Sequence, residues 1–206
     1  YIGSEFKRQL NKLNLPFLCW SNTRTTTLES LQSWYQNENS PKVTFVINSA
    51  GYTGKPNADA CEVNKDKTIH GNVVWPQIIT NFCMINNIPL GHVSSGCIYS
   101  GRRYDGRPFT ELDDPNFTFI QNNCSFYSGT KAISEHIVNE LEKSYIWRLR
   151  IPFEENNNPR NYISKMMNYE ELLQSENSIS NKQEFVNACI EMITKSVPYG
   201  IYNITN

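Results

Sequence analysis

The chain has 206 residues, of which 39% are hydrophobic and 19% are charged, and this is the composition of an ordinary globular domain. We therefore exclude intrinsic disorder, a collagen-like chain and a coiled coil. The 19 basic and 20 acidic side chains leave a net charge of −1. A chain of this charge has no general attraction for nucleic acid or for a membrane, so an anionic ligand requires a local site. The six cysteines are widely separated and no apolar run is long enough to span a bilayer. We expect reduced thiols and a cytoplasmic protein.

Short apolar segments alternate along the chain with segments of helical periodicity. We expect helices at 4–13, 27–36, 67–86, 127–143 and 183–195, and strands at 15–20, 43–48, 88–93 and 145–150. This alternation predicts an α/β fold in which helices cover both faces of a doubly wound parallel sheet. The ligand site of such a sheet lies beyond the carboxyl ends of its strands, where two predicted strands end in the small residues of 48–51 and 94–96.

Tyr127 and Lys131 are four residues apart at the start of a predicted helix, so both side chains point from one face. An ammonium group beside a phenol favours the phenolate, which brings the tyrosine closer to a useful general acid or base. Ser95 ends a predicted strand and places a hydroxyl at the same edge of the sheet. Alone, a Tyr-x-x-x-Lys pair is a weak signal, and this second group strengthens it.

Ser95 with Tyr127-x-x-x-Lys131, after a strand that ends in Asn48-Ser49-Ala50-Gly51, resembles the extended short-chain dehydrogenase/reductase family. The resemblance implies a Rossmann-like NAD(P)-binding domain over 1–206 and chemistry on a nucleotide sugar. Tyr127 would donate a proton to a substrate carbonyl that Ser95 holds, and Lys131 would bind the nicotinamide ribose. Further cofactor-binding residues implied by the resemblance are Tyr1, Ile2, Gly3, Ala50, Gly51, Asn72 and Ile151. The segment 1–5 resembles the end of a G-x-x-G-x-x-G turn, so we expect a strand and two glycines to precede it.

A closer similarity runs over essentially the whole chain and is carried by segments such as 50–57, 95–98, 150–152 and 158–162. They resemble the bifunctional 3,5-epimerase/4-reductases of UDP-rhamnose synthesis best known from plants. This resemblance implies UDP-4-keto-6-deoxyglucose as the substrate and a substrate-binding lobe that begins within about 152–200. The implied substrate-binding residues are Thr53, Asn57, Ser95, Gly96, Cys97 and Asn161. A homodimer is a further expectation, without nucleic acid or membrane partners.

Epimerisation next to a ketone removes a proton from one face of the sugar and returns one to the other face. Cys97 follows Ser95 by two residues, so in an extended segment both side chains point to one side. The resemblance assigns Cys97 and Lys165 as the two proton-transfer groups, without deciding which is the base. Without the resemblance, Cys97 would be interpreted as a packed core thiol and Lys165 as a solvated lysine.

Arg24 follows the strand predicted at 15–20, which is the second strand of the fold when the one expected before residue 1 is counted, and such folds distinguish NAD from NADP there. An arginine suits a ribose 2′-phosphate, so we expect NADPH, although loop arginines are common on protein surfaces. The three histidines have no partner at metal-ligand spacing, and we expect no metal site.

Two other functions remain compatible with the sequence. The first is a reductase without epimerase activity, similar to dTDP-4-dehydrorhamnose reductase, which would not need Cys97 or Lys165. The second is a non-catalytic NADP-binding subunit, in which Ser95, Tyr127 and Lys131 would be dispensable. The choice between UDP and dTDP, and the presence of a preceding dehydratase domain, stay open.

Overall fold

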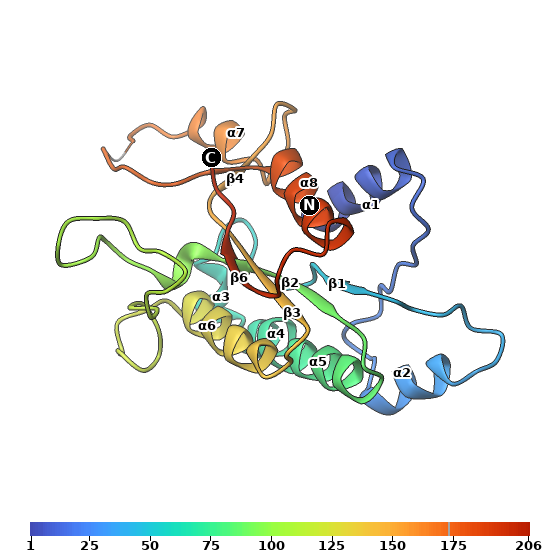
Figure 1. The fold of residues 1–206 in the computed structure, drawn as a ribbon. Coiled ribbons are helices and arrows are strands. Elements are labelled where there is room, and N and C mark those ends of the chain that lie inside the picture. The colour runs from blue at the N-terminus through green and yellow to red at the C-terminus, as the bar shows by residue number, and fades with distance from the viewer. Residues whose placement is uncertain (173) are drawn as a thin grey trace.

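The centre of the protein is a parallel four-stranded sheet, seen in a computed structural model that describes residues 1–172 and 174–206 (Figure 1). The strand order is β1-β2-β3-β6. The strands are β1 (Val46–Asn48), β2 (Leu90–Ser95), β3 (Ser144–Leu149) and β6 (Gly200–Asn203). Asn48 pairs with His92, and Ser95 pairs with Leu149, so the carboxyl ends lie along one edge. The predicted parallel α/β fold is confirmed.

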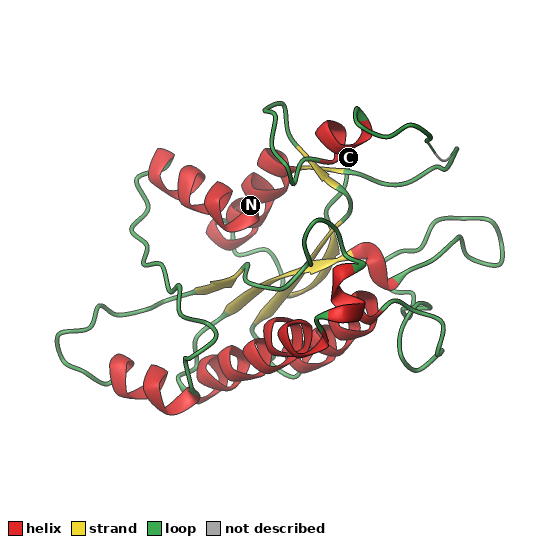
Figure 2. Cartoon of the chain, turned by 180° about the vertical axis from the view of Figure 1, so that it is seen from behind, coloured by secondary structure: helices red, strands yellow, loops and turns green. Residues whose placement is uncertain are grey.

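Helices cover both faces of this sheet (Figures 1 and 2). On one face, α1 (Ile2–Lys12) and α8 (Lys182–Thr194) pack side by side over an aromatic core that includes Phe6, Trp147 and Phe185. The other face carries α2 (Leu28–Tyr35), α3 (Ala60–Val63), α4 (Lys65–Ile69), α5 (Trp75–Ile85) and α6 (Phe126–Asn139). Two separate apolar cores, one on each face, make the sheet doubly wound as predicted.

The long helical segment predicted at 67–86 is helical throughout but not uniform. A π-helical turn, His70–Val74, joins α4 to α5. At this turn Gly71 lies against the loop that follows β1, because a Cβ on Gly71 would be 3.0 Å from the Tyr52 nitrogen. Such turns are frequent at functional sites, and this one carries Asn72.

The helix predicted at 127–143 ends earlier than its apolar spacing suggests. Its last residue is Asn139, after which Leu141 donates a backbone hydrogen bond to Val138 and turns into the core. The next residues start β3, since the Lys143 carbonyl already accepts a bond from Leu90. Sheet pairing therefore ends the helix.

The strand predicted at 15–20 is wrong, because this segment has an irregular backbone. A strand requires a neighbour to pair with, and among the described residues no strand pairs with it. Its first residue, Leu15, donates instead to the Leu10 carbonyl of α1. Leu18 and Trp20 are exposed. Apolar composition alone does not make a strand.

A small two-stranded sheet lies beyond the carboxyl end of β3. It pairs β4 (Pro152–Phe153) with β5 (Ser180–Asn181), and α7 (Tyr162–Met166) packs beside β4. The connection from β3 passes through Ile151, whose φ of 42° lies in the left-handed region that β-branched residues rarely adopt. Within the described residues, no helix has the length and apolar character needed to cross a membrane.

Candidate active site

Ser95 and Cys97 lie where β2 ends. The Ser95 hydroxyl accepts a hydrogen bond of 3.3 Å from the Cys97 backbone nitrogen and so caps a short 3-10 turn, Gly96–Ile98. This local cap orients both side chains at the carboxyl edge of the sheet. Both groups lie at the edge expected from the sequence, but the extended segment expected through Cys97 is wrong, because Gly96–Ile98 form a 3-10 turn that Ser95 caps.

Tyr127 and Lys131 lie on the first turns of α6. Ser125 begins this helix by accepting a hydrogen bond of 3.2 Å from the Ser128 nitrogen. Lys131 is buried, and its Nζ donates to the Val93 carbonyl at 3.0 Å and lies 3.3 Å from His92 Nε2. Both groups belong to β2, so the lysine ties α6 to the strand that carries Ser95.

Burial controls the protonation of this cluster. Burial raises the pKa of Tyr127 well above its usual range, Cys97 raises it further, and the Ser95 hydrogen bond opposes this. The net lowering of the Tyr127 pKa expected from Lys131 is therefore wrong, because burial outweighs the groups that favour the phenolate. Burial also raises the pKa of Cys97, whereas Ser95, Ser128, Lys131 and Arg150 lower it. Burial lowers the pKa of Lys131 to about 8, against the opposing effects of Glu135 and Cys97. The phenol and the thiol therefore hold their protons, and Lys131 can exchange one near neutral pH.

Asn72 connects the loop after β1 to α6. Its Oδ1 accepts from the Tyr52 nitrogen at 2.8 Å, and its Nδ2 donates to the Tyr52 carbonyl at 2.9 Å and lies 3.2 Å from Thr130 Oγ1. A Cβ on Gly51 would be 3.2 Å from Asn72 Oδ1, which explains a glycine there. Asn72 thus shapes the edge of the sheet next to the candidate catalytic cluster.

The remaining residues predicted to bind the cofactor lie in three places: at the start of α1 beside the end of β1, at Arg24, and at Ile151 after β3. Tyr1, Ile2 and Gly3 begin α1, and a Cβ on Gly3 would be only 2.8 Å from the Ser49 hydroxyl. The start of α1 therefore approaches Ser49, next to Ala50 at the carboxyl end of β1. Arg24 is exposed in the turn between α1 and α2, and its side chain has no hydrogen-bond or ion-pair partner among the described residues.

The residues predicted to bind substrate are spread over three segments. Thr53 and Asn57 lie on the loop after β1, where Asn57 Nδ2 donates to Asp59 at 2.9 Å. Lys165 Nζ donates to the Pro56 carbonyl at 3.3 Å and joins α7 to that loop. Asn161 is buried at the start of α7, and its Nδ2 donates to the carbonyls of Glu154 and Asn156. In this arrangement Asn161 shapes the backbone rather than projecting a free amide.

Two residues of the cluster were not singled out in the sequence. Arg150 lies at the end of β3, with its stem 3.5 Å from where a Gly96 Cβ would be, and its charge lowers the pKa of Cys97 and Tyr127. His92 contacts Lys131 from inside β2. Arg150 could have been found from the sequence, because it ends a predicted parallel strand at the edge that carries the site. A single histidine within a buried strand, such as His92, gives no such indication.

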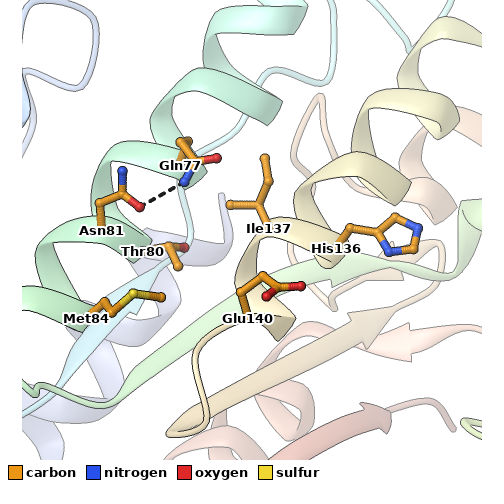
Figure 3. Close-up of a pocket in the computed structure, with 7 residues that line it drawn as sticks. All are labelled: Gln77, Thr80, Asn81, Met84, His136, Ile137 and Glu140. Atoms are coloured by element: carbon orange, nitrogen blue, oxygen red, sulfur yellow. Dashed lines mark hydrogen bonds between the residues drawn. The ribbon is translucent and has the colours of Figure 1, made fainter.

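A surface hollow between α5 and α6 lies apart from this cluster (Figure 3). It is lined by Gln77, Thr80, Asn81, Met84, His136, Ile137 and Glu140. Gln77 and Asn81 are bonded to each other at 2.9 Å. None of the predicted site residues lines this hollow, so we do not place the active site there.

Comparison with known proteins agrees with the resemblance found in the sequence. A family model described as the RmlD substrate binding domain matches residues 1–184. The chain belongs to this family. Over 187 residues, or 87% of the chain, it is 37% identical to two Arabidopsis thaliana proteins. One is a trifunctional UDP-glucose 4,6-dehydratase/UDP-4-keto-6-deoxy-D-glucose 3,5-epimerase/UDP-4-keto-L-rhamnose-reductase, and the other a bifunctional dTDP-4-dehydrorhamnose 3,5-epimerase/dTDP-4-dehydrorhamnose reductase. The match spans 27% of the first and 59% of the second.

Solved structures share the fold. The L780 UDP-rhamnose synthase of Acanthamoeba polyphaga mimivirus superposes with a TM-score of 0.86 at 23% identity, covering 100% of this chain and 71% of that one. The dTDP-4-dehydrorhamnose reductase of Bacillus anthracis, solved with NADP, superposes with a TM-score of 0.78 at 20% identity. The match covers 100% of this chain and 70% of that one. These similarities confirm the Rossmann-like fold of the family.

Proposed function

We propose that this chain is part of an enzyme that epimerises C3 and C5 of UDP-4-keto-6-deoxy-D-glucose and reduces its C4 ketone with NADPH, giving UDP-L-rhamnose. The observation that carries the proposal is the meeting of Ser95 and Cys97, at the end of β2 and in the turn after it, with Tyr127 and Lys131 from α6. The names of the Arabidopsis relatives, which combine an epimerase with a reductase, support it.

Reduction of a ketone requires a proton donor at its oxygen. Tyr127 suits this role because its raised pKa keeps the phenol protonated, and the Ser95 hydroxyl beside it can hold the same oxygen. Lys131 can return a proton to the phenol because its pKa is about 8. These three residues supply and replace the proton of one turnover.

The edge of the sheet also fits a dinucleotide. Helix α1 begins beside the carboxyl end of β1, and Gly3 leaves no side chain between them. The unpaired backbone N–H groups at a helix start suit a pyrophosphate, so Tyr1, Ile2 and Gly3 would bind it, with Ala50 and Gly51 beside them. When bound there, NADPH supplies the hydride for the ketone carbon.

Epimerisation requires two further proton-transfer groups on opposite faces of the sugar. Cys97 lies inside the cluster, whereas Lys165 reaches the loop after β1 from α7. A sugar held between the β2 end and that loop would have one group on each side. We therefore assign the exchange of the C3 and C5 protons to Cys97 and Lys165.

A reductase without epimerase activity is the second candidate, and one observation favours it. Burial raises the pKa of Cys97, which makes the thiol a poor base in this environment. The intact Ser95, Tyr127 and Lys131 cluster argues against the third possibility, a non-catalytic NADP-binding subunit.

The deciding experiment measures the two half-reactions separately. We expect Cys97→Ser and Lys165→Met to block deuterium uptake at C3 and C5, while NADPH oxidation with an already epimerised 4-keto sugar continues. Each proton-transfer group contributes roughly 10²–10⁴-fold to its own step. Cys19→Ser and Lys42→Met, at exposed positions, are the matched controls. Normal deuterium uptake by the Cys97 variant would leave the reductase as the function.

The second sheet and α7 support a related proposal, that the segment from about 152–200 begins a substrate-binding lobe. These elements pair with each other rather than with the main sheet. Lys165 on α7 joins this segment to the loop after β1 through its hydrogen bond to the Pro56 carbonyl.

Exposed Met84 and Ile85 on α5 support a homodimer formed through the α5 face. Light scattering of the intact protein tests this, with Met84→Lys as the variant expected to yield monomers.

A further inference from the structure

A continuous hydrogen-bond chain runs through the interior from α5 to Lys131. Trp75 Nε1 and the Ala50 nitrogen both donate to Asn48 Oδ1, at 3.0 and 3.2 Å. Both groups are donors only, so they determine which end of the Asn48 amide is the oxygen. The NH₂ end consequently faces His92 Nδ1 at 3.0 Å.

This chain determines the tautomer of His92. An amide NH₂ cannot accept a hydrogen bond, so His92 Nδ1 must accept one and carry no proton. His92 is fully buried, and burial together with Lys131 lowers its pKa well below the ordinary value, so the ring is neutral. Its single proton therefore resides on Nε2.

Two groups face that Nε2–H. Ser134 Oγ lies at 3.3 Å and donates its own proton to the Lys131 carbonyl, so it can accept from His92. Lys131 Nζ also lies at 3.3 Å. An ammonium group has only donors, whereas an amine has a lone pair that can accept the imidazole N–H. The neutral ring therefore disfavours the ammonium form of Lys131.

We propose that His92, held as the Nε2–H tautomer by Asn48 and Trp75, is a positioning residue that fixes Lys131 and favours its uncharged form. The inference rests on the proposed function, because a lysine whose ammonium form loses its proton near neutral pH can reprotonate the Tyr127 phenolate after each reduction. The resulting amine then takes up a proton from water. The other ionisable groups of the cluster around Lys131 are Glu135 and Tyr127 on α6 and Cys97 after β2. Glu135 and Cys97 raise the pKa of Lys131, whereas His92 favours the uncharged amine.

The test is a direct titration of Lys131 in the intact protein without substrate, so its result does not depend on the proposed reaction. The readout is the ¹³Cε signal of labelled lysine, assigned by its loss in Lys131→Met. His92→Asn keeps an acceptor for Asn48 but removes the N–H next to Nζ. We expect the Lys131 midpoint to rise by about half a pH unit or more.

Ser134→Ala changes the same site in the opposite direction. It removes the competing acceptor, so His92 Nε2–H turns to Lys131, and the midpoint should fall. A purely structural role for His92 would not give shifts of opposite sign. An unchanged midpoint in a folded His92→Asn protein overturns the proposal. If His92→Asn does not fold, a Ser134→Ala midpoint that stays or rises overturns it equally.

Discussion

At the scale of single residues, the chemistry depends on groups whose proton affinity is changed by burial. Tyr127, Cys97 and Lys131 are common residue types, and only the buried edge of β2 gives them unusual pKa values. Arg24 is the opposite case, a residue whose surroundings leave it exposed. We therefore make one prediction about proton transfer, at Tyr127, and one about cofactor binding, at Arg24.

Tyr127→Phe should abolish ketone reduction while the protein stays folded. The substitution removes the proton donor and retains the ring, so the loss should be on the order of 10²-fold or more. The measurement is NADPH oxidation with a 4-keto nucleotide sugar, beside a thermal melt. Near wild-type reduction would contradict the assignment of the Ser95, Tyr127 and Lys131 cluster.

Arg24→Ala should weaken binding of NADPH much more than binding of NADH. The reason is that only NADPH carries the 2′-phosphate that a guanidinium can bind with two hydrogen bonds. Dissociation constants for both cofactors, measured by fluorescence, test this. Equal weakening of NADPH and NADH binding would show that Arg24 does not bind the 2′-phosphate.

At the scale of the elements, close approaches between side chains and glycines decide how the strands and helices pack. Gly91 in β2 lies under the ring of Trp147 in β3, where a Cβ would be 2.0 Å from the ring. Gly129 in α6 lies under Phe119, where a Cβ would be 2.4 Å from the ring. The two rings differ in how far they can move, since Trp147 is fully buried and Phe119 is 42% exposed.

Gly91→Ala should therefore destabilise the protein by about 1–3 kcal/mol, because a buried ring in a packed core cannot move aside. Gly129→Ala should cost far less, because Phe119 can move into solvent and alanine favours a helix by roughly 1 kcal/mol over glycine. Urea unfolding of both variants gives the comparison. Equal losses would show that Phe119 is as confined as Trp147.

At the scale of the whole molecule, stability should depend on pH through His92. Its pKa in the folded protein is lowered well below the ordinary value of 6.5, so only the unfolded chain takes up a proton as the pH falls through that value. The stability that neutral His92 contributes is complete above about pH 6.5 and declines by about 1.4 kcal/mol per pH unit below it.

Urea unfolding between pH 7.5 and 5.5 measures this decline. The same series on His92→Asn is the control, because asparagine does not titrate. Glu5 complicates the series only at lower pH, since its pKa is lowered from 4.5. A decline of equal slope in both proteins would assign it to other groups.

The amino-acid sequence by itself determined the class of the fold and most of the helices. Periodicity and the alternation of segments are local properties, so a pattern of neighbouring residues is enough to predict them. The Ser95 and Tyr127-x-x-x-Lys131 motif was readable for the same reason, and so was the family.

Only the tertiary structure decided which distant groups meet. The segment at 15–20 has the composition of a strand but pairs with no described strand, and strand formation requires a partner. The contact of Lys165 with Pro56, and the chain from Trp75 through Asn48 and His92 to Lys131, join residues far apart in sequence. Burial and non-local hydrogen bonds set the protonation of these groups, and both exist only once the chain has folded.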